Sequence, residues 1–408
     1  MERLRQLSPQ LRQYLLVTAN YWAFTLTDGA LRMLVVLHFH QLGYSPLQIA
    51  LLFLFYEFFG VVTNLTGGWL GARLGLNRTM NLGLLLQVVA LAMLLVPLAW
   101  LTVAWVMVAQ ALSGIAKDLN KMSAKSAIKL LVPADAQGTL YRWVAILTGS
   151  KNALKGAGFF MGGLLLMVLG FRGAVLFMAV ALALIWLLSM ARLRRDFGKA
   201  KNAPKFSQIF SKSSPVNTLS AARLFLFGAR DVWFVVALPV YLAVSLGWDH
   251  WQVGGFLALW IIGYGVVQTQ APRLTAPAGR TPDGRDALGW ALVLSIVPAL
   301  IAALLWLEVA VQWSLLIGLL VFGVVFAINS SLHSYLIVHY ADADGVSLDV
   351  GFYYMANAMG RLMGTLLSGW LFQSHGLAVC LLVSSGFVLL AALLSAGLPH
   401  HRRLNPAA

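Results

Sequence analysis

Charged side chains occur inside stretches of this chain that are otherwise apolar enough to span a lipid bilayer. The residues concerned are Asp28, Arg32, Lys151, Lys155, Arg230, Asp231 and Arg361. A charged side chain at the bilayer centre costs about 2.5 to 3.5 kcal/mol even on insertion scales, so it must face a partner or a wet cavity. Because cations outnumber anions in this set, the sequence predicts a polar route that attracts a negatively charged molecule.

Two lysines in the stretch LTGSKNALKGAGFF lie one helical turn apart, with Asn152 beside the first of them. Counting from the start of the predicted helix at about 1.5 Å per residue places Lys151 roughly 17 Å into the bilayer. Ammonium groups bind phosphate as compact point charges, so Lys151 and Lys155 are predicted to bind an anion. The alternative is a lysine neutralised by Asp28 or Asp118. The neighbouring glycines permit close helix packing.

A second series of lysines recurs every four residues, which places them along one helical face. They are Lys117, Lys121, Lys125 and Lys129. Lys117 is predicted to face the cavity near its inner mouth, because Gln110 and Ser113 continue the same polar stripe. Lys125 and Lys129 are expected to be solvated cytoplasmic anchors of the positive-inside kind.

The second half of the chain contributes Arg230, which shares a helical face with Arg223 seven residues earlier. A guanidinium matches phosphoryl oxygens in bidentate geometry, so Arg230 is predicted to be a ligand; the alternative is an ion pair with a carboxylate. The full predicted substrate-binding set is Arg32, Lys117, Lys151, Asn152, Lys155, Arg230, Asn329, His333 and Arg361.

Three acids lie far enough into predicted spans to carry protons: Asp28, Glu57 and Asp231. Asp28 has an alternative role as the partner of Arg32 one turn on. The sequence contains no pattern typical of a nucleotide-binding loop, a metal cluster or a catalytic triad. We therefore expect no cofactor, no metal, no enzymatic activity and no ATP-driven transport by this chain.

The composition predicts the elements that position these residues. With 60% hydrophobic and 11% charged residues among 408, and a mean hydropathy of +0.80, the chain is predicted to be an all-α polytopic membrane protein. A span needs about 20 apolar residues, which leaves room for twelve helices. They are predicted at residues 11–41, 46–71, 79–97, 102–122, 139–168, 172–192, 216–246, 250–271, 287–307, 312–338, 349–373 and 376–397.

The net charge of +15 would suggest nucleic acid in a soluble protein, but here most basic residues lie in loops. The loops after predicted spans 1, 3, 7, 9 and 11 contain no Lys or Arg, whereas the alternate loops are basic. Under the positive-inside rule both termini are then cytoplasmic. We expect a multi-pass protein of the bacterial inner membrane, surrounded by lipid, with no nucleic-acid partner.

Two halves of the chain resemble each other. LGYSPLQIALLF from Leu42 aligns with LGWDHWQVGGFL from Leu246 at an offset of 204 residues, which superposes Gln48 on Gln252. Asn152 likewise matches Asn357 at an offset of 205. These repeats predict two six-helix bundles, residues 1–193 and 216–408, joined by a cytoplasmic linker at residues 194–215 and facing a central cavity.

The turn GGWLGARLGLNR at residues 67–78 resembles the cytoplasmic signature of the major facilitator superfamily. The matching positions, which the resemblance assigns to a cytoplasmic gate, are Gly68, Arg73, Gly75 and Arg78. Ala72 stands where the family usually has an acidic residue, so the usual charge clasp is not expected in the same form. Alternatively, any short cytoplasmic turn can contain glycine and arginine.

Four longer runs resemble the organoarsenical-exporting permeases of bacterial arsenic-resistance operons. They are TANYWAFTLTDGALRMLVVLHFHQLGYSP, SGIAKDLNKMSAKSAIKLL, LTGSKNALKG and FGARDVWFVVALPVY. The resemblance covers nearly the whole chain. It implies that glyceraldehyde-3-phosphate dehydrogenase makes 1-arseno-3-phosphoglycerate from arsenate and that a monomeric permease extrudes it, after which the unstable ester breaks down outside.

Other functions fit the same cations. Any organic phosphate would suit them, so a different major facilitator transporter or a proton-linked drug exporter is an alternative. A membrane-embedded enzyme is an alternative from another class, which a substrate-turnover assay in detergent would detect.

Overall fold

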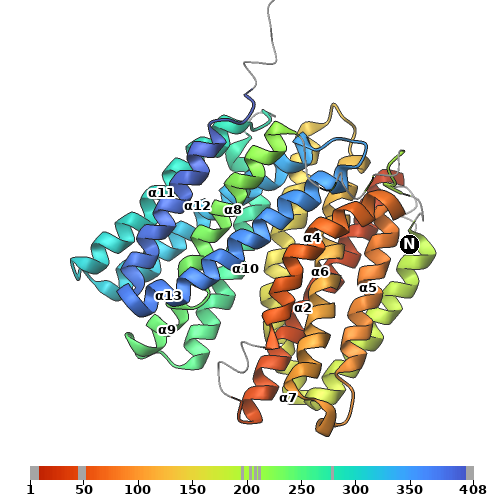
Figure 1. The fold of residues 1–408 in the computed structure, drawn as a ribbon, viewed down its shortest axis with the longest axis horizontal. Helices are drawn as coiled ribbons and strands as arrows, with labels where there is room; N and C mark the ends of the chain where they lie inside the picture. Colours follow the sequence, from red (N-terminus) through yellow and green to blue (C-terminus); the bar gives the residue numbers. More distant parts are fainter. Residues whose placement is uncertain are drawn as a thin grey trace, which may run out of the picture. The chain divides into compact units, whose positions relative to one another are not determined.

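The computed structural model describes residues 9–44, 52–193, 197–201, 205, 209, 213–276 and 280–400. Gln48 and most of the predicted 194–215 linker lie outside these residues. The helices (Figure 1) are α2 Pro9–Gln41, α4 Leu54–Leu74, α5 Leu76–Met93, η1 Leu98–Trp100, α6 Val103–Leu131, α7 Gln137–Arg192, α8 Ser214–Phe234, α9 Ala237–Val244, α10 His250–Thr275, α11 Gly284–Trp306, α12 Val311–Tyr340 and α13 Val346–Ser395.

Two of these helices are each interrupted by one glycine. Gly170 in α7 has φ 66° and ψ 177°, and Gly376 in α13 has φ 80° and ψ −177°. A positive φ is readily adopted only by glycine, so the chain turns there without a longer loop. Each helix therefore supplies two spans, and the breaks fall at the predicted 168/172 and 373/376 boundaries. With α8 and α9 forming one span, the twelve-helix, all-α prediction is confirmed.

Helix α8 ends before α9 because of a proline. The ring of Pro239 in α9 would clash with the carbonyl group four residues earlier, at Val235, and this breaks the helix. The freed backbone N–H of Ala237 instead donates to Ser368 Oγ at 3.1 Å. Span 7 is therefore kinked here, and the backbone donor at Ala237 is satisfied.

Within the part of the chain that the structure describes, seven helical segments are long and apolar enough to cross a membrane by length and composition. Helices α2, α4 and α6 are not among them, and these three hold Asp28, Arg32, Glu57 and Lys117, charges that lower the local hydropathy. The segments that qualify are Leu76–Met93, Gln137–Arg192, Ser214–Val244, Gln252–Thr275, Gly284–Trp306, Val311–Tyr340 and Val346–Ser395.

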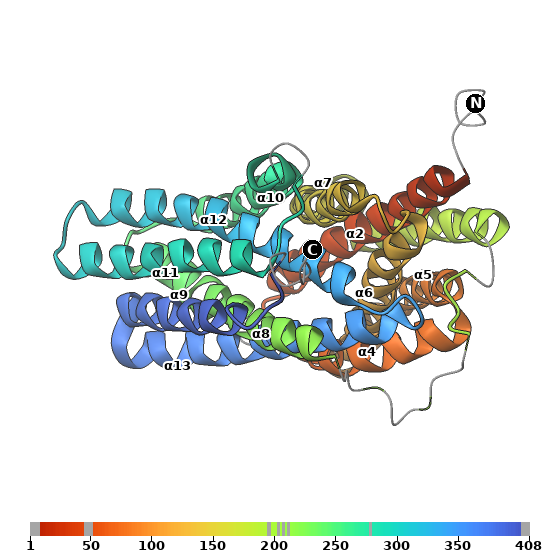
Figure 2. The ribbon, with the colours of Figure 1, turned by 90° about the horizontal axis from the view of Figure 1, so that it is seen from above.

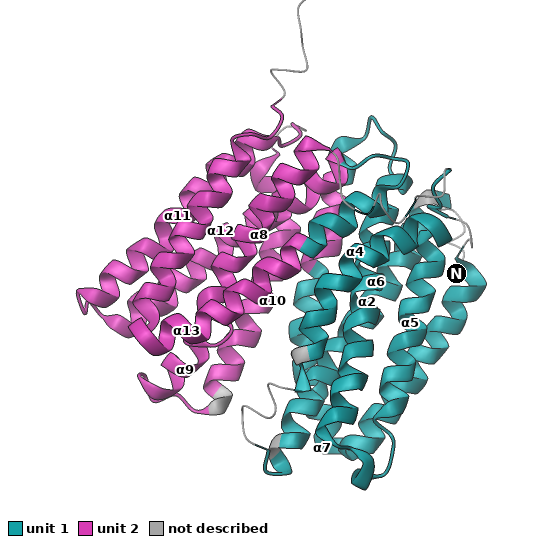
Figure 3. Ribbon diagram, viewed as in Figure 1, with its two compact units in different colours: residues 1–140, 150–210, 341–355 teal, residues 141–149, 211–340, 356–408 magenta. Residues whose placement is uncertain are grey.

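The chain divides into two compact units (Figure 3). Unit 1 comprises residues 1–140, 150–210 and 341–355, and unit 2 comprises residues 141–149, 211–340 and 356–408. Unit 2 has an aromatic core that includes Trp233, Trp260 and Phe322, and its helices α11 and α12 run side by side (Figure 2). Relative to the predicted halves, each unit includes one short segment of the other half. The boundaries predicted from the repeat remain a proposal.

The same glycine-based packing occurs in both units. In unit 1, a Cβ atom built on Gly158 of α7 would lie 2.7 Å from the Leu26 carbonyl oxygen of α2. In unit 2, a Cβ atom on Gly364 of α13 would lie 2.6 Å from the Gly228 carbonyl oxygen of α8. Helix backbones therefore touch at both places, as small residues permit. The close packing expected of the glycines after Lys151 is confirmed.

The predicted topology can be tested by cysteine labelling of a Cys380→Ala variant, in which an introduced cysteine is the single thiol of the chain. Cys380 itself is fully buried. Lys205→Cys, in the linker, is expected to react only with reagents that reach the cytoplasm. Trp100→Cys, at a side chain 67% exposed after α5, should react from outside intact cells. Reaction of both positions from the same side would contradict the topology.

Candidate functional site

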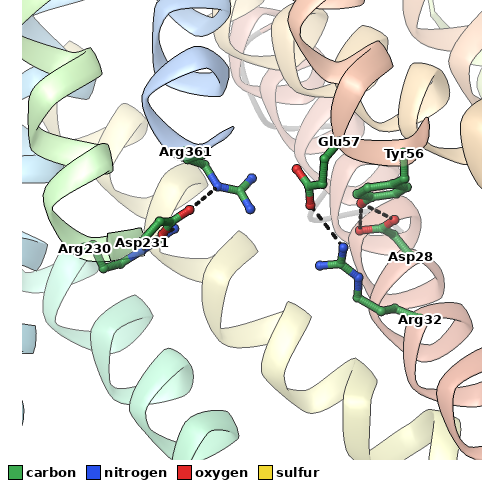
Figure 4. A network of polar contacts seen from close by, with 7 residues as sticks. All are labelled: Asp28, Arg32, Tyr56, Glu57, Arg230, Asp231 and Arg361. Atoms are coloured by element: carbon green, nitrogen blue, oxygen red, sulfur yellow. Dashed lines mark hydrogen bonds and ion pairs between the residues drawn. The ribbon is translucent and has the colours of Figure 1, made fainter. Parts of the chain in front are cut away.

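Unit 1 holds a chain of three polar contacts around Tyr56 of α4. The Tyr56 hydroxyl donates to both carboxylate oxygens of Asp28 on α2, at 2.8 and 3.1 Å (Figure 4). The Lys117 ammonium of α6 lies 3.8 Å from the centre of the Tyr56 ring, a cation–π contact. Asp28 is only 5% exposed. A predicted proton carrier and a predicted anion ligand are thus joined through one tyrosine.

A second pair in unit 1 joins Arg32 of α2 to Glu57 of α4. The Arg32 Nη2 donates to Glu57 Oε1 at 3.0 Å, and the two side chains are 26% and 33% exposed (Figure 4). The guanidinium also lies 5.0 Å from the ring centre of Phe53 and 4.9 Å from that of Tyr56. Arg32 is therefore oriented by aromatic rings and by a carboxylate that reaches the surface of the unit.

Among the lysines further along α6, Lys125 differs from the sequence-based expectation. Lys121 pairs with Asp118 at 2.6 Å, and its ammonium lies 4.6 Å from the Tyr354 ring centre. Lys125 lies 5.0 Å from the same ring and is 3% exposed. The expectation of a solvated anchor is wrong for Lys125, because its charge is held against an aromatic face. Lys129 is partly exposed.

The lysines of α7 lie on the helix that packs directly on α2. The Trp22 indole of α2 donates to Ser150 Oγ at 2.7 Å, next to Lys151, and a Cβ atom on Gly29 would lie 2.7 Å from the Lys155 carbonyl oxygen. The side chains of Lys151, Asn152 and Lys155 are half-buried. Unit 1 therefore contains these lysines together with Lys117 and Arg32.

Unit 2 builds its charged cluster around Asp231, which is fully buried. Arg230 Nε donates to Asp231 Oδ1 at 2.6 Å, and Arg361 Nε of α13 donates to Oδ2 at 3.0 Å (Figure 4). The Arg230 guanidinium lies 5.0 Å from the Phe227 ring centre and 5.7 Å from that of Phe326. The ion pair considered as an alternative for Arg230 is present, and two guanidiniums share its carboxylate.

Helix α12 places its two predicted ligands inside unit 2. The Asn329 side chain donates to the Trp290 carbonyl oxygen at 2.9 Å and so joins α12 to α11. His333 is fully buried, and neither ring nitrogen has a hydrogen-bond partner among the residues that the structure describes. The Asn329 amide nitrogen takes part in helix packing, whereas its side-chain oxygen and both His333 ring nitrogens have no partner among the described residues.

The predicted gate at residues 67–78 joins α4 to the start of α13, and both belong to unit 1. Ser347 Oγ donates to the Gly68 carbonyl oxygen at 2.7 Å. A Cβ atom on Gly351 would lie 2.6 Å from the Asn64 carbonyl oxygen and 2.9 Å from the Gly68 Cα. The contact is therefore made by backbone and one hydroxyl.

The remaining gate positions shape the turn between α4 and α5. Gly75 has φ 99° and forms the junction of the two helices. Ala72 is fully buried, and its carbonyl oxygen accepts from the Ala200 N–H at 2.8 Å. An acidic side chain at position 72 would be enclosed, which accounts for the alanine. Arg73 and Arg78 are exposed, with Arg73 over the Trp69 ring.

Sequence reasoning missed several residues that hold the charges in place. Tyr56 was signalled only by its position beside Glu57, and Asn357, which bonds Arg223 at 2.9 Å, only by the repeat. Tyr354 and Ser347 carried no signal in a single sequence, since an aromatic or hydroxyl side chain in an apolar span is ordinary.

Long apolar helices that place charged side chains within both units are typical of a multi-pass membrane protein. Residues 14–283 match the model of the Major Facilitator Superfamily. This match covers more than half of the chain, and the protein belongs to that superfamily. A search of the curated proteins finds no match.

Solved structures of transporters share the fold. The human organic anion transporter MFSD10 (TETRAN) superposes with a TM-score of 0.76 at 18% identity, covering 95% of this chain and 100% of that one. A bacterial homologue of the iron transporter ferroportin gives 0.74 at 15% identity, covering 94% and 98%. The E. coli fucose:proton symporter FucP gives 0.71 at 13%, covering 94% and 99%. At such identities the likeness concerns the fold alone.

Proposed function

We propose that this transporter exports an anionic organoarsenical, 1-arseno-3-phosphoglycerate, by alternating access and so confers resistance to arsenate. The observation that carries the proposal is the excess of cations at buried and half-buried positions. In unit 2, Arg230 and Arg361 both bond the single carboxylate of Asp231. In unit 1, the half-buried Lys151 and Lys155 add to Lys117. An anion with several oxygens suits positions so rich in cations.

The chemistry of the side chains fits a phosphoryl and an arsenyl group. The planar guanidiniums of Arg230 and Arg361 can each offer two parallel N–H donors, whereas the lysine ammonium groups act as point charges. The four sequence runs that resemble organoarsenical permeases support this cargo. An anionic cargo also agrees with the likeness in fold to MFSD10, an organic anion transporter. Glyceraldehyde-3-phosphate dehydrogenase would supply the substrate.

Proton antiport is part of the proposal, and Asp28 is its preferred carrier. Asp231 and Glu57 are each held by arginine, so protonating either would leave a cation without its carboxylate. Asp28 accepts hydrogen bonds from the neutral Tyr56 hydroxyl, and the Lys117 ammonium lies over the Tyr56 ring. Asp28 therefore has a tyrosine hydroxyl, rather than an arginine, as its described hydrogen-bond partner.

The proposal is tested with lipid vesicles into which the purified transporter is reconstituted with its cytoplasmic face outward. Arsenate, glyceraldehyde 3-phosphate, NAD and glyceraldehyde-3-phosphate dehydrogenase, supplied outside, form the labile ester in place. We expect arsenic to accumulate in the vesicles only when all four are present, and faster with an imposed pH gradient. Uptake of glycerol 3-phosphate but not of arsenic would instead favour the organic-phosphate alternative.

A further inference from the structure

The aromatic ring of Tyr56 in unit 1 contacts two of the predicted substrate ligands. The Lys117 ammonium of α6 lies 3.8 Å from the ring centre, and the Arg32 guanidinium of α2 lies 4.9 Å from it. Tyr56 itself is only 2% exposed, whereas Lys117 and Arg32 are partly exposed. Because an aromatic face attracts cations through its π electrons, this buried ring positions two cations that are themselves accessible.

A close approach of two helix backbones fixes Tyr56 next to Lys117. A Cβ atom on Gly114 of α6 would lie 2.7 Å from the Tyr56 carbonyl oxygen and 3.1 Å from the Tyr56 Cα. The α4 and α6 backbones therefore touch here, as a small residue permits. Gly114 and Lys117 are three positions apart, on one face of α6. The packing that brings Tyr56 against α6 thus also brings Lys117 over its ring.

The Tyr56 hydroxyl connects the same ring to Asp28. It donates to Oδ1 at 2.8 Å and to Oδ2 at 3.1 Å, so its position is fixed by both carboxylate oxygens (Figure 4). A hydroxyl that donates to a carboxylate forms a strong, charge-assisted bond, which polarises the phenol and makes its ring face more attractive to a cation. A proton on Asp28 removes the carboxylate charge and turns one acceptor oxygen into an O–H group. The hold on Tyr56, and with it the position of Lys117, is then weakened.

The other acids on the helices around Asp28 pair with cations. Glu57 of α4 pairs with Arg32 at 3.0 Å, and Asp118 of α6 pairs with Lys121 at 2.6 Å. The further titratable groups on the helices that pack on this part of α2 are Lys117 of α6, Lys151 and Lys155 of α7, and, on α2 itself, Tyr21, which is near enough to feel the Asp28 charge. A proton on Asp28 therefore acts first on the tyrosine hydroxyl to which this carboxylate is bonded.

We propose that Tyr56 is a positioning residue that couples the proton on Asp28 to the binding of the anionic substrate by Lys117. With Asp28 ionised, the ring is fixed and Lys117 is in place; with Asp28 protonated, Lys117 loses its position and the affinity for substrate falls. Since coupling between two ligands is reciprocal, substrate binding favours release of the proton, which is the sign that antiport requires. The inference rests on the proposed function. Charge alone predicts the opposite sign, because a proton adds positive charge near an anion.

The test compares Tyr56→Phe, which keeps the ring and removes the hydroxyl, with Asp28→Asn, which imitates the protonated acid. The Kd of the stable phosphomonoester 3-phosphoglycerate is measured on purified transporter at mildly acidic and mildly alkaline pH. Each value is divided by the wild-type Kd at the same pH, which cancels the titration of the probe's own phosphate. At alkaline pH we expect both variants to raise the Kd about tenfold, as loss of a charge-assisted hydrogen bond does.

The acidic arm and the double variant separate coupling from mere packing. At acidic pH both Kd ratios should approach one, because the proton carrier of the wild type is then protonated as well. Tyr56→Phe combined with Asp28→Asn should bind no more weakly than either single variant, since both act through one contact. Tyr44→Phe removes a hydroxyl from a partly exposed tyrosine whose ring packs on Phe39; this matched control should bind like the wild type at both pH values.

A purely structural Tyr56 predicts that Tyr56→Phe raises the Kd equally at both pH values or lowers the temperature of thermal unfolding until the protein no longer folds. Either result, tighter binding of the probe by Asp28→Asn, or absence of probe binding to the wild type would overturn the proposal. A Kd ratio that depends on pH as expected, without arsenic uptake in the vesicle assay, would support the coupling and reject the organoarsenical as cargo. Arsenic uptake with a constant ratio would support the export and reject Tyr56 as the coupling residue.

Discussion

Lys151→Gln and Arg230→Gln are each expected to abolish arsenate resistance while leaving the transporter in the membrane. Each removes one charge-assisted contact to the substrate, which is worth about 1.5 to 3 kcal/mol, or roughly a tenfold to hundredfold loss of affinity at about 1.4 kcal/mol per decade. Arg230→Lys should recover only part of the affinity, because the guanidinium fork is lost. Substrate binding by purified protein is the measurement. Arg142→Gln, an exposed position on the same helix as Lys151, is the matched control.

The ion pair with Asp231 gives Arg230 a second possible role, and a double variant separates the two. If Arg230 serves only to neutralise Asp231, which is fully buried, then Arg230→Gln combined with Asp231→Asn should regain both stability and binding. If Arg230 is a ligand, the double variant regains stability alone. Near-normal affinity in Lys151→Gln and Arg230→Gln would reject the proposed site outright.

The helical scaffold was predictable because its signals are local. Apolar runs set the spans, and the breaks at Gly170 and Gly376 fall where two runs meet without an intervening loop. The division into units was less predictable. Residues 141–149 and 341–355 each lie in one predicted half, yet each belongs to the unit built mainly from the other half. The unit to which each segment belongs depends on tertiary packing, and the periodicity of the sequence does not predict it.

The site was predictable in its residue types and only partly in its contacts. Charges in apolar spans are costly anywhere, so the sequence alone identified Asp231, Arg230 and Arg361. Their pairing depends on α13 packing on α8 through glycines, which a single sequence does not specify. Lys125 shows most clearly which contacts a single sequence does not predict. Its spacing indicated a solvated anchor, whereas the Tyr354 ring from a distant helix holds it buried.

Gly351→Val is expected to abolish transport while preserving substrate binding at the cytoplasmic face. The α4 and α13 backbones touch at this position, with a Cβ atom on Gly351 falling 2.9 Å from the Gly68 Cα, a separation that real Cβ atoms essentially never show. Valine must therefore push the two helices apart. In the proposed topology this contact lies at the cytoplasmic end, and alternating access requires that end to close. A transporter that cannot close there can bind its cargo from inside but cannot release it outside.

The measurement compares turnover with cytoplasmic-face binding for a graded series. Gly351→Ala should slow transport less than Gly351→Val, because its single methyl group demands a smaller displacement. Ser347→Ala removes one hydrogen bond to Gly68, worth about 1 kcal/mol, so it should slow transport only modestly. Gly263→Val, where a Cβ atom meets nothing within 4 Å, controls for the change from glycine to valine within a helix. Equal turnover in Gly351→Val and Gly263→Val would mean that this glycine contact does not form part of the gate. Loss of binding together with transport would mean that the contact is required for folding rather than for closure.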